Sequence, residues 1–279
     1  MRVVLQLSTV VAVWMIGGQC VAAADGNPWL TLVLGLLTAA LAVPAYRWAV
    51  RRTEHRAVSE LSREGAGAAT GRGVLIGVAL FGAVIMNLAF SGNYHVNGLG
   101  SVTGAVGLVG FMAAAAVTEE LVFRGTLFRL VEERGGTWIA LALTGTLFGL
   151  MHLLNPNADL WGAAAIAVEA GGMLGAAYAA TRRLWLPIGV HFGWNFAASG
   201  LFSTEVSGSD TPQGILDAAT SGPQLITGGD FGPEASVYSV AFGVVLTVVF
   251  MWLARRRGHL VPRRSRRGAG TGTATKVSG

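Results

Sequence analysis

Long apolar stretches alternate with short polar connections along most of the chain. Each stretch is close to the roughly 20 residues that an α-helix needs to cross the hydrocarbon core of a bilayer. The pattern therefore predicts an all-α, polytopic membrane bundle of about eight transmembrane helices, formed by a single domain over residues 1–254. The apolar stretches are Val3–Ala23, Trp29–Tyr46, Val74–Ser91, Val102–Phe123, Trp138–Leu154, Trp161–Ala180, Leu184–Phe202 and Ser236–Ala254.

Composition excludes the soluble alternatives. Of the 279 residues, 52% are hydrophobic and only 13% are charged, whereas a soluble domain has about 25% charged residues. A water-soluble globular enzyme, a disordered chain and a coiled coil are therefore excluded. Cys20 is the one cysteine in the sequence, so the chain cannot form an internal disulfide.

The basic residues predict how the bundle is oriented. In the eight-span arrangement all 20 Lys and Arg residues fall on one side, and the connections on the other side contain none. The positive-inside rule then places both termini in the cytoplasm. We expect residues 255–279 to be a basic, disordered cytoplasmic tail that touches anionic lipid rather than nucleic acid. The connections without Lys or Arg are residues 24–28, 92–101, 155–160 and 203–235.

Two segments have more than one interpretation. Residues 1–24 carry Arg2, an apolar run and a Val-Ala-Ala-Ala stretch, so they fit an uncleaved span or a cleaved signal peptide. Residues 203–235 are long for a loop in a compact membrane domain. They either cover one face of the bundle or are disordered.

Several ionisable residues fall inside predicted spans, where they are costly and mark functional sites. Glu120 and Arg124 are four residues apart, so they share one helix face and can pair. Glu119 is rotated from that face by about 100° and can point into a cavity. The remaining intramembrane groups are His152, Glu169 and His191.

Counting from the turn between two predicted spans brings two of these residues together. Glu119 lies 16 residues before Gly135, and His152 lies 16 residues after Gly136. If both helices run to that turn, each residue lies about 25 Å from it, so a glutamate and a histidine meet inside the membrane. On a later span, His191 and Asn195 share one face.

Three short motifs carry a resemblance to a known family. They are Glu119-Glu120-x-x-x-Arg124, Phe148-x-x-x-His152 and His191-x-x-x-Asn195. In this order, on successive membrane helices, they resemble the CPBP family of intramembrane proteases, which includes the type II CAAX prenyl endopeptidases and bacterial relatives. The motif core covers about residues 110–199.

The resemblance implies an eight-helix protease core with a cavity open to the membrane or the cytoplasm. It implies that Glu119 and His152 activate a water for peptide hydrolysis and that His191 and Asn195 stabilise the oxyanion. Glu120, Arg124 and Phe148 would support the site. The substrate would be a membrane-associated peptide or protein. Arg outnumbers Lys 19 to 1, which fits a GC-rich bacterial genome. We therefore expect a bacterial cell membrane and do not assign a prenylated substrate.

The residues leave the cofactor open. Glu119, His152 and His191 are candidate zinc ligands, because two histidines and a glutamate are a common zinc set. The zinc signature His-Glu-x-x-His is absent from the sequence, however. A metal-free mechanism in which Glu119 activates water is therefore favoured over zinc.

Two other functions compete with the protease. Glu119, His152, Glu169 and His191 could form the proton relay of a proton-coupled transporter. A catalytically inactive scaffold or immunity protein could also keep these residues for structure alone. Loss of peptide cleavage in Glu119→Gln favours the enzyme, and proton-dependent flux without cleavage favours the transporter.

Overall fold

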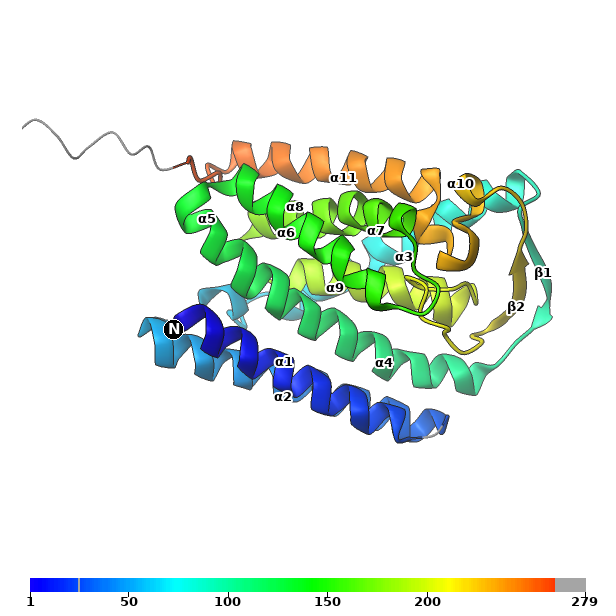
Figure 1. The fold of residues 1–279 in the computed structure, drawn as a ribbon, viewed down its shortest axis with the longest axis horizontal. Coiled ribbons are helices and arrows are strands. Elements are labelled where there is room, and N and C mark those ends of the chain that lie inside the picture. Colours follow the sequence, from blue (N-terminus) through cyan, green and yellow to red (C-terminus); the bar gives the residue numbers. More distant parts are fainter. Residues whose placement is uncertain (25, 264–279) are drawn as a thin grey trace, which may run out of the picture.

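The computed structural model describes residues 1–24 and 26–263. Its long helices lie side by side along one axis, with α1 and α2 on one side of the bundle and α11 on the opposite side (Figure 1). The long elements are α1 (Arg2–Ala22), α2 (Pro28–Glu54), α3 (Ala66–Phe90), α4 (Val102–Glu120), α6 (Thr137–Met151), α9 (Trp185–Asn195) and α11 (Val237–Arg256).

Three helices of the bundle contain π-helical segments. Helix α4 continues through η2 (Leu121–Phe128) into α5 (Arg129–Gly135). Helix α7 (Leu160–Ile166) continues through η4 (Ala167–Gly172) into α8 (Met173–Thr181), and α9 continues into η5 (Phe196–Leu201). Segments of this kind occur frequently at functional sites, and these three lie beside the ionisable residues of the spans.

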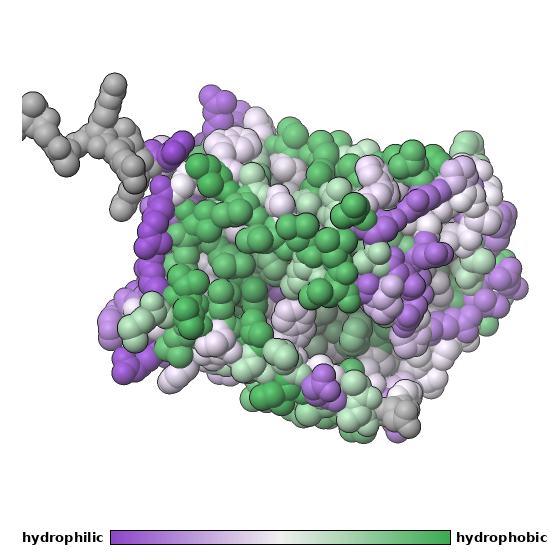
Figure 2. Space-filling model, viewed as in Figure 1, coloured by the Kyte–Doolittle hydropathy of each residue, from purple (hydrophilic) through white to green (hydrophobic). Residues whose placement is uncertain are grey.

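The expected membrane bundle is confirmed. Within the described residues, seven helices are long and apolar enough to cross a membrane. The one remaining predicted span, Leu184–Phe202, corresponds to α9 and η5, which form a shorter continuous helix over residues 185–201. Figure 2 shows a broad apolar band between two more hydrophilic ends of the molecule.

Glycines allow α3 and α9 to pack unusually closely. A Cβ atom at Gly193 would lie 2.4 Å from the carbonyl oxygen of Val74, and one at Gly77 would lie 2.3 Å from that of Val190. No side chain fits in so short a gap, so only glycine permits this approach. Close packing through small residues is typical of membrane helices, and it places α9 in the interior of the bundle.

The basic residues gather at one end of the bundle, which we call the arginine-rich end. Ion pairs there connect Arg2 with Glu133, and Arg182 with Glu132. Arg129 lies 2.8 Å from Glu54. These contacts join the start of α1, the end of α2, α5 and the connection after α8, as the eight-span arrangement requires.

The opposite end carries a small β-structure that the sequence did not predict. Strands β1 (Tyr94–Leu99) and β2 (Leu216–Thr220) pair antiparallel, with Tyr94 opposite Thr220 and Leu99 opposite Leu216. Residues 203–235 also contain α10 (Gln224–Thr227), η6 (Gly229–Phe231) and η7 (Pro233–Ala235). This loop therefore folds over one end of the bundle, and its interpretation as disorder is wrong.

The predicted boundaries need two corrections at the arginine-rich end. Helix α2 continues to Glu54 and α3 begins at Ala66, because the helices extend beyond the apolar stretch. Helix α11 ends at Arg256, and the backbone N–H of Val261 donates to Thr137 Oγ1 at 2.8 Å. Val261, within the predicted tail, thus contacts the first residue of α6. Residues 264–279 lie outside the described residues, and the basic, disordered cytoplasmic tail stays a prediction. The cleavage of residues 1–24 stays a prediction.

Candidate active site

The glutamate pair lies where α4 changes to π-helical geometry. Arg124 Nη1 donates to Glu120 Oε1 at 2.7 Å, and both side chains are at most 1% exposed. Arg124 Nη2 donates to the carbonyl oxygen of Ala170 at 3.0 Å. The predicted pairing of Glu120 and Arg124 is confirmed, and the buried charges compensate each other.

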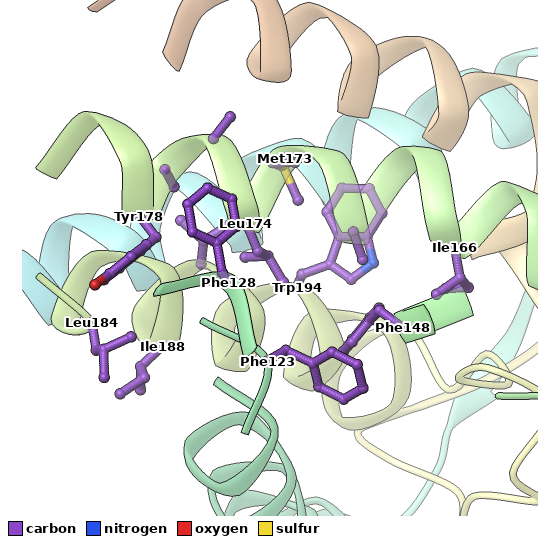
Figure 3. Packing of buried hydrophobic residues seen from close by; sticks show 14 of the residues in the cluster. Phe123, Phe128, Phe148, Ile166, Met173, Leu174, Tyr178, Leu184, Ile188 and Trp194 are labelled. Carbon is purple, nitrogen blue, oxygen red and sulfur yellow. The ribbon is translucent and has the colours of Figure 1, made fainter. Parts of the chain in front are cut away.

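Aromatic rings enclose this ion pair. The Arg124 guanidinium lies over the ring of Phe148, 4.6 Å from its centroid, a distance at which a cation is attracted to the ring face. Phe148 in turn packs edge-on against Phe123, with centroids 4.9 Å apart (Figure 3). Phe148 thus contacts the buried guanidinium of Arg124 on one side and Phe123 on the other.

His152 follows the last residue of α6, and its orientation is fixed by the helix. Its Nδ1 lies 2.7 Å from the carbonyl oxygen of Phe148. A carbonyl oxygen only accepts, so Nδ1 carries the hydrogen. In the neutral ring Nε2 is then a free acceptor.

His191 lies between the two carboxylates. Its Nδ1 is 3.0 Å from Glu120 Oε1, and its Nε2 is 3.8 Å from Glu119 Oε2. The first contact is a hydrogen bond and the second is too long for one. His191 therefore links the supporting pair to Glu119 and fixes how the two carboxylates lie relative to each other.

A cavity of about 310 Å³ joins three of the predicted residues, and we call it the catalytic cavity. Glu119, His152 and Asn195 line it. The side-chain amide of Asn195 makes no hydrogen bond to any of the described residues, whereas its backbone oxygen accepts from Ser199. A carboxylate, an imidazole and a free amide therefore line one partly open cavity.

Asn195 lines the catalytic cavity, whereas His191 is not among its lining residues. One helical turn of about 5.4 Å separates them. This offset is enough to place Asn195 in the cavity wall and His191 against the carboxylates. The position of His191 favours a role in orienting Glu119 over direct contact with an oxyanion.

The cavity wall also includes part of the 203–235 loop, which sequence reasoning did not connect with the site. Ser207, Ser209 and Thr211 line the cavity. Glu234 Oε2 accepts hydrogen bonds from the backbone N–H of Ser207 at 2.6 Å and from its hydroxyl at 2.8 Å. Trp194 Nε1 donates to Glu234 Oε1 at 2.9 Å. Burial raises the pKa of the Glu234 carboxyl.

Glu234 thus connects the loop to the residue beside Asn195. An acidic residue in a polar loop does not stand out in the sequence, so nothing local could have marked Glu234.

The intramembrane Glu169 is fully buried and has no hydrogen-bond partner among the described residues. Glu169 lies against Gly243 of α11 and does not line the catalytic cavity.

The donor geometry does not match a metal site. In the described part of the chain, no three His, Cys, Asp or Glu side chains converge as metal ligands would. The Nδ1 atoms of His152 and His191 are bound to Phe148 and Glu120, which leaves both Nε2 atoms free, as in histidines that ligate metals. In the described residues, however, Glu119, His152 and His191 are not gathered as one set of metal ligands.

The comparison with protein families agrees with this arrangement. Residues 100–197 match the family described as Type II CAAX prenyl endopeptidase Rce1-like. The matched range contains all three motifs and every residue of the cavity that they contribute. Searches of curated proteins and of solved structures found no match. Residues 100–197 are therefore similar to the Rce1-like family, and this match supports the resemblance to the CPBP intramembrane proteases.

Proposed function

We propose that the chain is an intramembrane endopeptidase in which Glu119 and His152 activate a water and Asn195 stabilises the oxyanion. The observation that carries the proposal is the shared cavity, because it brings one residue from each of the three motifs to the same space. Peptide hydrolysis needs a base, a place for water and a donor for developing negative charge. These three side chains can supply them.

The first step is the attack of water. Glu119 accepts one hydrogen of the water and Nε2 of His152 accepts the other, which leaves an oxygen lone pair directed at the substrate carbonyl. The water oxygen forms a bond to the carbonyl carbon as Glu119 takes the proton. The carbonyl oxygen becomes an oxyanion and accepts a hydrogen bond from the amide of Asn195.

The second step is the collapse of the tetrahedral intermediate. The carbonyl π-bond re-forms, the carbon–nitrogen bond breaks, and the protonated Glu119 gives its proton to the departing amine. The immediate products are a new carboxylic acid, which keeps the second hydrogen of the water, and a new amine. Transfer of the acid's proton to the amine gives a carboxylate and an ammonium group, and Glu119 returns to its starting state. Water and Glu119 supply every proton, so no step requires a metal.

The second layer of the site holds Glu119 in position. His191 lies 3.8 Å from Glu119 and donates to Glu120, which is itself paired with Arg124. This series of contacts compensates the charge of Glu120, while Glu119 lines the catalytic cavity. We infer that Glu120, Arg124 and His191 are positioning residues and that Phe148 fixes the arginine.

The test is cleavage by purified protein in detergent, with Glu119→Gln compared with Glu64→Gln. The probe is a pooled library of internally quenched peptides. Glu64 is an exposed carboxylate at the arginine-rich end, so it controls for loss of charge alone. We expect cleavage by wild type and Glu64→Gln and none by Glu119→Gln. Proton-dependent flux without cleavage would favour a transporter, and a cellular phenotype that survives Glu119→Gln would favour a scaffold.

A further inference from the structure

The catalytic cavity continues into a second cavity of about 470 Å³. The two cavities share Val21, Phe111, Ser209 and Thr211. The second also reaches Gly26 and Pro28, between α1 and α2, and Gly104 in the first turn of α4. Together they form one groove, which runs from Glu119 to the end of the bundle that carries β1 and β2.

This groove ends opposite the arginine-rich end. Figure 1 places β1 and β2 at the far end of the bundle from α5 and the N-terminus. The connections at that far end, residues 92–101, 155–160 and 203–235, contain no Lys or Arg. By the positive-inside rule they lie outside the cytoplasm. The cytoplasmic opening implied by the family resemblance therefore does not fit the observed wall of the cavity.

Among the described residues, the lining of the groove contains no Lys or Arg. Its acidic residues are Glu119 and Asp210, and it includes the histidine His152. A substrate with a free carboxylate close to its scissile bond would bring an anion into this groove. Its desolvation costs free energy, and no Lys or Arg of the described lining offsets that cost. Apolar and small polar side chains, such as Phe111, Ser209 and Thr211, suit an uncharged stretch of polypeptide.

The wall that closes the groove is a built part of the fold. Ser207 is held by two hydrogen bonds to the buried Glu234, which also binds Trp194 of α9. The backbone N–H of Thr211 donates to Glu205 Oε2 at 3.2 Å. The segment between these anchors therefore keeps Ser209 at the junction of the two cavities.

We propose that the groove admits an uncharged internal stretch of a polypeptide from the extracytoplasmic side, and that the chain cleaves substrates there and not at a cytoplasmic C-terminus. The inference rests on the proposed function and adds to it the side of entry and the substrate class. Ser209 and Thr211 are the residues that contact the substrate between the outer opening and Glu119.

The experiment uses the full chain with Cys20→Ser, in right-side-out and inverted membrane vesicles of expressing bacterial cells. One variant adds Ser209→Cys at the junction, and the matched control adds Arg51→Cys at the exposed arginine-rich end. The probes are a membrane-impermeant bulky maleimide and a library of internally quenched, uncharged peptides that carry acetylated and amidated ends.

We expect right-side-out vesicles to label Ser209→Cys and to cleave the library, and inverted vesicles to label Arg51→Cys and not to cleave it. Labelling should lower cleavage by Ser209→Cys at least tenfold relative to the same variant unlabelled. Labelling of Arg51→Cys in detergent should leave its rate unchanged. Peptides with a free carboxylate next to the scissile bond should be cleaved at least tenfold more slowly than their amidated forms.

Three results would overturn the inference while the proposed function stands: cleavage only by inverted vesicles, full activity of labelled Ser209→Cys, or equal rates for amidated and carboxylate peptides. Failure of the proposed function is distinguishable from these. It would appear as no cleavage in any vesicle and none after solubilisation in detergent, and it would remove the inference with it.

Discussion

The side chains of Asn195 and Glu119 line the catalytic cavity and make no hydrogen bond to any described residue, whereas His152 is bound to Phe148. Of these two, Asn195 is the one that carries hydrogen-bond donors. The amide of Asn195 faces the cavity without a hydrogen bond to any described residue. A preorganised hydrogen-bond donor stabilises a transition state most strongly when it is directed at the atom on which negative charge develops.

Replacing Asn195 should therefore slow the chemical step. We expect Asn195→Ala to lower kcat about 100-fold, the scale observed for loss of one oxyanion donor, with a much smaller change in KM. Steady-state cleavage of the peptide library in detergent measures both constants. An unchanged kcat would remove Asn195 from the oxyanion role.

Arg124 should matter for stability as well as for activity. It is 1% exposed and its partner Glu120 is fully buried, so Arg124→Leu leaves an unpaired charge in the interior. Breaking a buried pair in this way costs about 3–5 kcal/mol. Thermal unfolding in detergent should show a clearly lower Tm for Arg124→Leu than for wild type.

A double variant tests the cause. Glu120→Gln combined with Arg124→Leu removes the stranded carboxylate, so it should unfold at a higher temperature than Arg124→Leu alone. An Arg124→Leu protein that unfolds like wild type would contradict the pairing. A double variant no more stable than the single one would attribute the loss to packing against Phe148.

At the scale of elements, the loop over residues 203–235 is the feature that completes the site. The membrane helices supply the reacting side chains, but Ser207, Ser209 and Thr211 supply one wall of the cavity. The loop is held to α9 by Glu234, whose two carboxylate oxygens accept from Trp194 and from Ser207. A loop anchored in this way can be loosened without unfolding the helices.

The loosening can be measured with Glu234→Gln. Glutamine keeps one acceptor oxygen, so it cannot satisfy both Trp194 and Ser207, and a hydrogen bond to a charged group is worth about 1.5–3 kcal/mol. We expect faster amide hydrogen exchange over residues 203–213 and a KM that rises more than kcat falls. Asp230→Asn, at an exposed position of the same loop, is the control. Unchanged exchange in Glu234→Gln would show that the carboxylate does not anchor the loop.

Sequence patterns predicted the helices better than the connections between them. Hydropathy marks where lipid ends, so it placed the apolar part of α2 but missed the turns from Arg47 to Glu54, which continue as helix beyond the membrane. Strands β1 and β2 pair residues more than a hundred positions apart, such as Tyr94 and Thr220. Nothing local in either segment indicates that pairing.

The residues of the site also divide into those that the sequence could predict and those that it could not. Glu119, His152 and Asn195 could be found because each is a polar residue in an apolar span, and spacing from the Gly135–Gly136 turn predicted that two of them meet. The place of His191 depends on how α9 packs against α4, which spacing does not specify. Glu234 could not be found because its burial arises only when the loop folds over α9.

At the scale of the whole molecule, the arginine-rich end is a network of ion pairs that holds separate segments together. Arg56 donates to Glu60 at 2.8 and 2.9 Å and also binds Glu54, and Arg129 reaches Glu54 from α5. Burial raises the pKa of Glu60, but the hydrogen bonds from Arg56 outweigh it, so the pKa lies below its ordinary value of 4.5.

This shift predicts how stability depends on pH. A carboxyl whose pKa is lowered by folding stabilises the native state above its unfolded pKa, and the contribution disappears as pH falls through the folded pKa. Glu60→Gln should therefore have a lower Tm than wild type at neutral pH, and the difference should shrink as pH falls below about 4.5. Glu64→Gln, at an exposed position, should show no difference. A difference in Tm between wild type and Glu60→Gln that stays constant with pH would contradict the lowered pKa of Glu60.

The fate of the attacking water tests most directly whether Glu119 activates it. Single-turnover cleavage of a peptide in water enriched in the heavy oxygen isotope, followed by mass spectrometry of the products and the protein, identifies where the new oxygen goes. We predict one heavy oxygen in the new carboxylate, none in Glu119, and no cleavage by Glu119→Gln. Heavy oxygen in the Glu119 side chain, or cleavage that survives Glu119→Gln, would contradict a water activated by this glutamate.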